Sequence, residues 1–154
     1  MPGGNYFSCA RTGLPAQVWC WGENRFNSLG ANLPPPAGNP TEVALSAQEM
    51  TIGFGHVEGG DDHACAKLND SVLVCWGGNE TGQLGSAPVL DGGLPPTVVY
   101  SNVASFSAGY QHTCALTNDN QLLCFGANPM GELGDGTTTP HATPTLVAPA
   151  CPVP

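Results

Sequence analysis

Three cysteine pairs are the side chains of this sequence best suited to chemistry. The pairs are Cys9 with Cys20, Cys65 with Cys75, and Cys114 with Cys124. His63 and His112 each stand two residues before a cysteine, so the second and third groups offer one imidazole and two thiols to a zinc ion. Four ligands at zinc-finger spacing are absent, however. We therefore interpret each pair as a disulfide, with zinc binding as the alternative.

The spacing within each pair predicts a β-hairpin closed by a polar turn. The second pair is symmetric about Asp70 and the third about Asp119, and both residues lie in runs of Asn, Asp and Ser that favour turns. This symmetry places the two cysteines of a pair opposite each other on antiparallel strands. Their Cα atoms would then be about 4.5 to 5.5 Å apart, which is within the range of a disulfide. The first pair follows the same pattern with one extra residue between its cysteines.

The hairpins belong to a repeat of roughly fifty residues. After its second cysteine each copy continues with an aromatic residue, Gly, any residue, Asn, four more residues and Leu-Gly. The aromatic residues are Trp21, Trp76 and Phe125, and the asparagines are Asn24, Asn79 and Asn128. A period of this length, rich in Gly and Pro, suits the four short strands of a propeller blade. We expect an all-β fold, a partial β-propeller of about three four-stranded blades with a disulfide within each blade.

Pro-rich connectors and short apolar segments mark the expected blade boundaries. The boundaries are residues 1–40 for an incomplete first blade and connector, 41–93 for the second blade, 94–139 for the third, and 140–154 for a tail. We expect the first blade to lack its opening strand. Pro144–Val147 in the tail resembles Pro96–Val99, so we expect a further opening strand there. That strand would complete the first blade, in the same chain or in a neighbouring one.

The frame His-x-Cys-Ala, followed by Cys-Trp-Gly-x-Asn-x-x-Gly-x-Leu-Gly, resembles the repeat of the regulator of chromosome condensation family. Residues 63–85 and 112–134 carry it most fully. Known members build seven-bladed propellers and include an exchange factor for a nuclear GTPase, a photoreceptor, an enzyme inhibitor and receptor ectodomains. The cysteine pairs more closely resemble the extracellular, crinkly-type version of the repeat. The resemblance implies the fold and leaves the function open, and three repeats are too few to close a ring.

The recurring aromatic residues and histidines are interpreted as structural. Trp21, Trp76 and Phe125 recur in every copy, which favours blade-to-blade contacts over the alternative of a sugar-binding surface. His63 and His112 are expected to be buried or hydrogen-bonded within their repeats, since Phe7 replaces them in the first copy. No nucleophile with a matched base stands out, so we expect neither an enzyme nor a cofactor.

Two sequons make Asn69 and Asn79 candidates for N-glycosylation. Asn69 is the stronger candidate, because it lies at a hairpin tip, whereas Asn79 has the recurring loop position. The seventh cysteine, Cys151, is left without an in-repeat partner. Its alternatives are a bond outside this chain segment and a free thiol.

The charge balance excludes several classes of partner. The chain has 12 Asp and Glu but 3 Lys and Arg, a formal net charge of −9 over 154 residues. Nucleic acids need clustered basic residues, so neither DNA, RNA nor an anionic membrane surface is an expected partner. No run of eighteen apolar residues occurs, and we expect no membrane insertion. Glu58, Asp61 and Asp62 are interpreted as a solvated loop, with calcium binding as the alternative.

These features together predict a secreted, non-enzymatic structural or interaction module. Disulfides belong to oxidising compartments, which favours an extracellular location. The expected partner is the chain itself, in a head-to-tail assembly or filament formed by strand exchange, or another extracellular protein. The strand exchanged would consist of Thr143, Pro144, Thr145, Leu146 and Val147, with Cys151 placed to lock the joint. The alternative is a fragment of a longer receptor ectodomain or of a secreted binding or inhibitor propeller.

Overall fold

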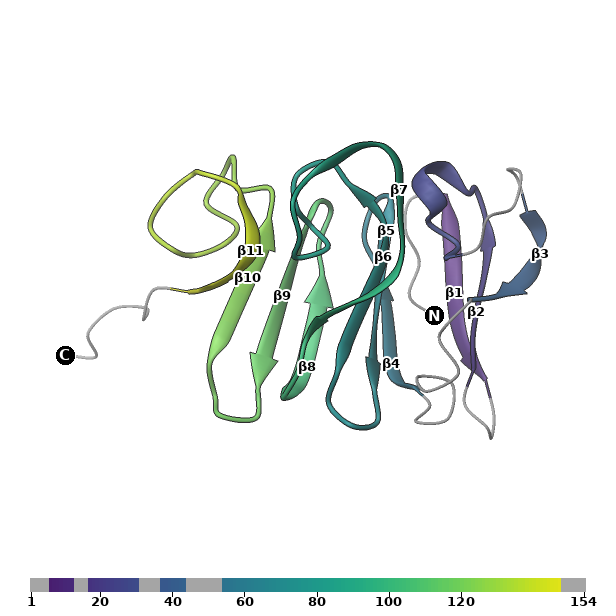
Figure 1. Ribbon diagram of the computed structural model, residues 1–154, viewed down its shortest axis with the longest axis horizontal. Coiled ribbons are helices and arrows are strands. Elements are labelled where there is room, and N and C mark those ends of the chain that lie inside the picture. The colour runs from purple at the N-terminus through teal and green to yellow at the C-terminus, as the bar shows by residue number, and fades with distance from the viewer. Residues whose placement is uncertain (1–5, 13–16, 31–36, 44–53, 148–154) are drawn as a thin grey trace.

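A computed structural model describes residues 6–12, 17–30, 37–43 and 54–147 of the chain. The described residues form three antiparallel sheets that stand side by side in a row (Figure 1). Their elements are β1 (Phe7–Thr12), β2 (Gln17–Gly22), the 3-10 helix η1 (Arg25–Asn27), β3 (Ala37–Glu42), β4 (Phe54–Gly59), β5 (His63–Leu68), β6 (Leu73–Asn79), β7 (Val89–Tyr100), β8 (Val103–Ala108), β9 (His112–Thr117), β10 (Leu122–Gly126) and β11 (His141–Leu146). An all-β, partial β-propeller is therefore the fold of this chain.

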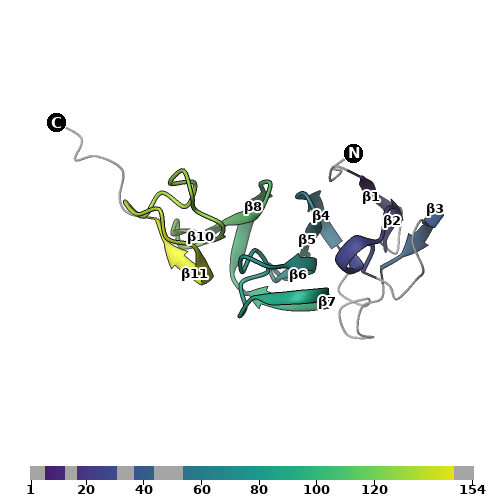
Figure 2. The ribbon, with the colours of Figure 1, turned by 90° about the horizontal axis from the view of Figure 1, so that it is seen from above.

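Each sheet is built around one cysteine hairpin. The strand orders are β1-β2-β3 in the first sheet, β4-β5-β6-β7 in the second and β8-β9-β10-β11 in the third. Seen from above, β4 and β8 lie on one side of the row, whereas β7 and β11 lie on the other (Figure 2). Among the described residues the first sheet has no strand equivalent to β4 and β8.

The hairpin registers confirm the predicted disulfides. Each cysteine of a hairpin is the direct cross-strand partner of the other, and the two Cα atoms of each pair are 4.1 Å apart. The disulfides join Cys9 to Cys20, Cys65 to Cys75, and Cys114 to Cys124. Their thiols are therefore not available to zinc. The polar turns lie where symmetry predicts them, and Ser71 and Asn120 take left-handed dihedrals there, with φ of 71° and 59°.

The last strand of each sheet, β3, β7 or β11, differs from the expected assignment. Leu94–Tyr100 was expected to open the third blade, but β7 pairs with β6, with Thr97 opposite Cys75. After β6 ends at Asn79, the chain passes through the loop of residues 80–88 and returns antiparallel along the free edge of β6 as β7. The sheets therefore group residues 7–42, 54–100 and 103–146, and the strand between residues 94 and 100 closes the second blade.

The tail strand requires the same correction. β11 contains Thr143 to Leu146 and pairs with β10 of its own chain, with Thr145 opposite Cys124. It is the fourth strand of the third blade, because it fills the free edge of β10 as β7 fills that of β6. The expected exchange of this strand into a first blade would break an existing sheet. Cys151 lies outside the described residues.

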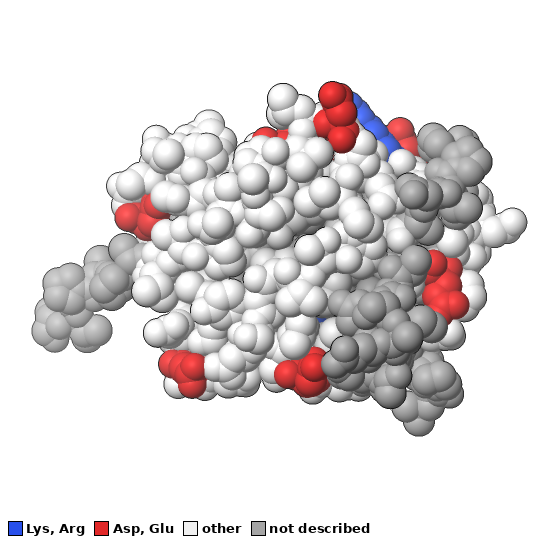
Figure 3. Space-filling view, in the orientation of Figure 1, with Lys and Arg blue, Asp and Glu red and all other residues white. Residues whose placement is uncertain are grey.

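The acidic side chains are dispersed over the surface. In the orientation of Figure 3 they occur at separate places along the rim, and most of the face between them is uncharged. His141 and Asp135 form a partly buried pair, with 2.6 Å between Nε2 and Oδ2. None of the helices in the described parts of the chain is long and apolar enough to cross a membrane.

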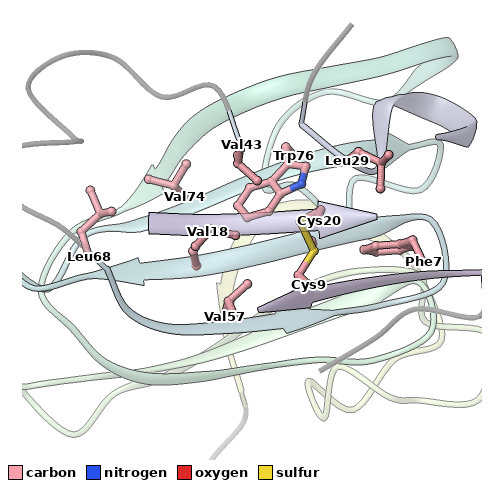
Figure 4. Close-up of a cluster of buried hydrophobic side chains, with 12 residues drawn as sticks. Phe7, Cys9, Val18, Cys20, Leu29, Val43, Val57, Leu68, Val74 and Trp76 are labelled. Atoms are coloured by element: carbon pink, nitrogen blue, oxygen red, sulfur yellow. A yellow bond between two sulfur atoms is a disulfide. The ribbon is translucent and has the colours of Figure 1, made fainter. Parts of the chain in front are cut away.

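The core lies between the sheets. One cluster of buried side chains joins the first sheet to the second (Figure 4), and another joins the second to the third. Trp76 occupies the first cluster beside the Cys9–Cys20 disulfide, and Phe125 occupies the second with Cys65 and Cys75. The sheets thus have little hydrophobic core of their own and stabilise one another, as in other repeat architectures.

Candidate functional site

The two contacts between neighbouring sheets follow one rule. The face of a sheet that carries the cysteines packs against the opposite face of the next sheet, which carries the recurring aromatic residue. Val18 beside the first disulfide and Leu73 beside the second are equivalent, and their exposed fractions are 1% and 0%. We call each such contact a blade joint, the first between sheets one and two and the second between sheets two and three.

Backbone carbonyls accept hydrogen bonds across both joints. The indole Nε1–H of Trp76 donates to the carbonyl oxygen of Ser28, at 3.0 Å. In the second joint the hydroxyl of Thr113 donates to the carbonyl oxygen of Gln83, also at 3.0 Å. Ser28 and Gln83 hold the same place in their repeats, directly before the Leu-Gly pair. One carbonyl of this loop is therefore an acceptor for the following sheet in each joint.

His63 contributes to the second joint, not to its own repeat as expected. Its Nε2 lies 3.0 Å from the Thr113 hydroxyl oxygen of the next sheet. Because that hydroxyl donates to Gln83, it accepts from His63, which places the proton on Nε2. Among the described residues Nδ1 has no hydrogen-bond partner, although it is buried. Burial, with the nearby His112 in addition, lowers the pKa of His63 to about 3.

The recurring asparagines brace the loops that reach across the joints. The side-chain oxygen of Asn79 accepts from the backbone N–H of Leu84 at 2.9 Å, and its amide nitrogen donates to the carbonyl oxygens of Ser86 and Ala87. Asn128 does the same in the third repeat, at 2.9 Å from the N–H of Leu133. Asn79 is fully buried and both ends of its amide are used. The folded chain therefore has no room for a glycan at Asn79.

Asn69 remains a candidate for glycosylation. It is exposed at the tip of the β5–β6 hairpin, as the sequence predicts.

The structure gives no support for the alternative of calcium binding by the acidic residues. Within the part of the chain that the structure describes, no group of three or more His, Cys, Asp or Glu side chains is placed to hold a metal ion.

Each end of the row presents a sheet face that resembles one side of a blade joint. The first outer face consists of Ser8, Ala10, Trp19 and Trp21 on β1 and β2, which are cross-strand neighbours and partly exposed. The last outer face consists of His112, Cys114, Leu116, Leu122 and Cys124 on β9 and β10. Neither face meets another sheet among the described residues.

Exposure is the clearest sign that the last outer face lacks a neighbour. Leu122 holds the position of Val18 and Leu73, yet its exposed fraction is 44%, against 1% and 0% for those two residues. Its cross-strand partner Leu116 is 36% exposed. Trp21 shows the same at the other end, since it is partly exposed while Trp76 and Phe125 are fully buried. These two faces are the candidate interaction site.

Sequence reasoning found the aromatic residues and missed the strand that frames each joint. Pro-Thr-x-Val occurs at Pro40–Val43, Pro96–Val99 and Pro144–Val147. In each case the threonine pairs with the second cysteine of the preceding hairpin. The Pro-Thr-x-Val segment follows each cysteine hairpin at nearly the same distance along the sequence. This nearly constant spacing was the signal that could have assigned the strand to the preceding blade.

Models of the regulator of chromosome condensation repeat match residues 73–116 and 103–132. Among curated proteins, the probable E3 ubiquitin-protein ligase HERC4 of Rattus norvegicus is 28% identical over 80 residues, which are 52% of this chain and 7% of that protein. Alsin of Rattus norvegicus is 32% identical over 100 residues, 63% of this chain and 6% of Alsin. The chain thus spans a small part of the curated relatives it matches.

Solved propellers share the fold. Prp20p of Saccharomyces cerevisiae, described with its binding to Gsp1p and histones, aligns over 94% of this chain and 37% of its own, with a TM-score of 0.74 and 24% identity. Human WBSCR16 aligns over 93% and 37%, with a TM-score of 0.76 and 20% identity. The crinkly ectodomain of the Arabidopsis thaliana receptor kinase ACR4 aligns over 94% and 38%, with a TM-score of 0.50 and 22% identity. The predicted closeness to the crinkly type therefore has weak support, because the other propellers superpose better.

Proposed function

Because this chain carries regulator of chromosome condensation repeats in a partial propeller, we propose that it is a secreted, non-enzymatic interaction module that associates with itself head to tail. The observation that carries the proposal is the pair of outer faces. Each has side chains at the positions through which the internal sheets contact one another, and all of these except Cys124 are at least partly exposed. A surface that combines exposed leucine and tryptophan side chains is typical of a protein interface.

The route of association differs from the one expected from the sequence. The tail strand is already paired with β10, so stacking of whole sheets takes the place of strand exchange. A first outer face and a last outer face are different surfaces, and their contact is heterologous. Such a contact gives a ring if the rotation closes and a filament if it does not.

The extracellular location rests on the disulfides. All six cysteines among the described residues are paired in disulfides, and such bonds persist outside the reducing cytosol. The net charge of −9 favours solubility of the separate chains. The receptor ectodomain of ACR4 shares the fold.

A second candidate is a segment of a longer receptor ectodomain or secreted binding propeller. Here further blades of the same polypeptide cover both outer faces. The small share of the solved propellers that this chain spans, 37% and 38%, supports it.

Static light scattering on a dilution series under non-reducing conditions separates the two candidates. Self-association predicts a molar mass that rises with concentration from the 15.8 kDa of one chain to twice that value or more. A mass of one chain at every concentration would contradict self-association and favour the second candidate.

A further inference from the structure

Resting on the proposed self-association, we infer that the last outer face of one copy docks on the first outer face of a second copy as one more blade joint, with Trp21 seated over Gly134. The occupant is a second copy of this chain, because the contacts of the two internal joints can be continued at both outer faces, position by position.

The first contact that can be continued is the packing of the recurring aromatic ring on the glycine of the preceding Leu-Gly pair, which we call the aromatic seat. A Cβ at Gly30 would lie 3.2 Å from the ring of Trp76, and one at Gly85 would lie 3.4 Å from the ring of Phe125. Gly134 holds the same place and has the same left-handed backbone, with φ of 64°. A Cβ there meets only Val147 within 4 Å, and no aromatic ring among the described residues. In the described part of the chain no aromatic ring therefore packs on Gly134, and Trp21 packs on no equivalent glycine.

The backbones also approach closely across each joint. Gly77 follows Trp76, and a Cβ on it would lie 3.3 Å from the Cα of Ser28. Gly126 follows Phe125 and stands in the same way 3.2 Å from the Cα of Gln83. Gly22 follows Trp21 with the same kind of backbone, φ 115°. The first outer face therefore has the small residue that lets a preceding loop come near.

A polar pair distinguishes the second joint from the first. His63 faces Thr113 across the second joint. The equivalent residues of the first joint are Phe7 and Ala64, which are both buried in one apolar cluster. At this position the first joint therefore pairs two apolar side chains, and the second pairs two polar ones.

The two residues left over at the outer faces are again a polar pair. His112 is the histidine of the last outer face, and Ser8 stands at the position of Thr113 on the first. An imidazole can donate to the serine hydroxyl as His63 donates to Thr113. The carbonyl of Glu132, at the place of Ser28 and Gln83, is the acceptor for the indole of Trp21 or for that hydroxyl. When the two outer faces are paired, the side chains of His112 and Ser8 are therefore both buried with a hydrogen-bond partner.

Four variants test the joint by sedimentation velocity. Leu122→Asp puts a charge on the last outer face and Trp21→Ala removes the ring from the first, so each should raise the dissociation constant about tenfold or more. Trp21→Phe should associate like the natural chain, because Phe125 fills the same seat in the second joint. Leu90→Asp is the matched control, since Leu90 is 71% exposed on β7, outside both faces.

Mixing the variants tests the head-to-tail geometry. Leu122→Asp keeps an intact first outer face and Trp21→Ala keeps an intact last outer face, so an equimolar mixture should recover heterodimers with one good joint. Like faces docking on each other would leave one of the two variants as associated as the natural chain.

The failure of this inference and that of the proposed function are distinguishable. A natural chain that is monomeric throughout would overturn both. A natural chain that associates, but equally well with Trp21→Ala or Leu122→Asp, would overturn only the joint. Loss of association in Leu90→Asp would also contradict the proposed location of the joint. The melting temperature of each variant at a concentration where all are monomeric checks that the fold is retained.

Discussion

His63 should make the stability of the fold depend on pH. Burial holds the pKa of His63 at about 3 in the folded chain, well below its ordinary value of 6.5. A histidine whose pKa is lowered on folding is neutral in the fold, so its contribution is complete above pH 6.5 and is lost as the pH falls towards 3. The physical cause of the lowered pKa is burial of the imidazole, with the nearby His112 in addition.

The magnitude follows from the difference between the two pKa values. Each pH unit below the pKa of the unfolded histidine lowers the free energy of unfolding by about 1.4 kcal/mol, until the pKa of the folded state is reached. Between about pH 7.5 and pH 5, protonation of the unfolded histidine alone should lower the free energy of unfolding by about 2 kcal/mol. That is a large part of the stability of a small domain, which is about 5 to 15 kcal/mol.

His63→Gln is the matched variant. Glutamine does not titrate and its amide N–H can donate to Thr113 as Nε2–H does. Urea unfolding followed by circular dichroism, at several pH values and with the disulfides intact, gives the free energy of unfolding for both proteins. All other titrating groups are shared, so the difference between the two curves reports on residue 63.

The natural chain should lose about 2 kcal/mol more than His63→Gln on going from pH 7.5 to pH 5. Parallel curves would refute the assignment of a buried neutral imidazole. His63→Phe provides a second comparison, since the first repeat has Phe7 at this position.

Three further outcomes follow from the same contacts. Asn79→Ala should lower the free energy of unfolding by about 1 to 3 kcal/mol, because the N–H of Leu84 and two carbonyls lose their partner; a thermal melt no lower than that of Asn69→Ala would contradict this. Replacing Cys65 and Cys75 together by alanine should cost about 2 to 4 kcal/mol, and an unchanged urea midpoint would show that the bridge is dispensable. Expression in a glycosylating secretory cell should give a glycan at Asn69 and none at Asn79, checked by peptide mass spectrometry after glycosidase treatment; a glycan on Asn79 in folded protein would contradict its burial.

The hairpins could be predicted from the sequence because their determinants are local. A pair such as Cys65 and Cys75, symmetric about a polar turn, specifies both the register and the bond, and the structure has the predicted pairing. The repeat of aromatic, Asn and Leu-Gly positions predicted a propeller in the same way.

The fourth strand could not be assigned by similarity alone. Pro96–Val99 and Pro144–Val147 resemble each other, but the likeness does not say which neighbouring hairpin a strand joins. That choice is made by the free edge of β6 or β10, to which the chain returns after a long loop. The partner of His63 was missed for a related reason, because Thr113 is fifty residues away and belongs to the next sheet.

Tryptophan fluorescence tests the central claim, burial of the first outer face in self-association, most directly. The chain has three tryptophans. Trp76 is fully buried, whereas Trp19 and Trp21 both lie partly exposed on the first outer face. Quenching by acrylamide therefore reports on that face in the natural chain, without any substitution. If self-association buries this face, the quenchable fraction should fall as the protein concentration and the molar mass rise. A quenchable fraction that stays constant while the mass grows would show that the chains associate elsewhere.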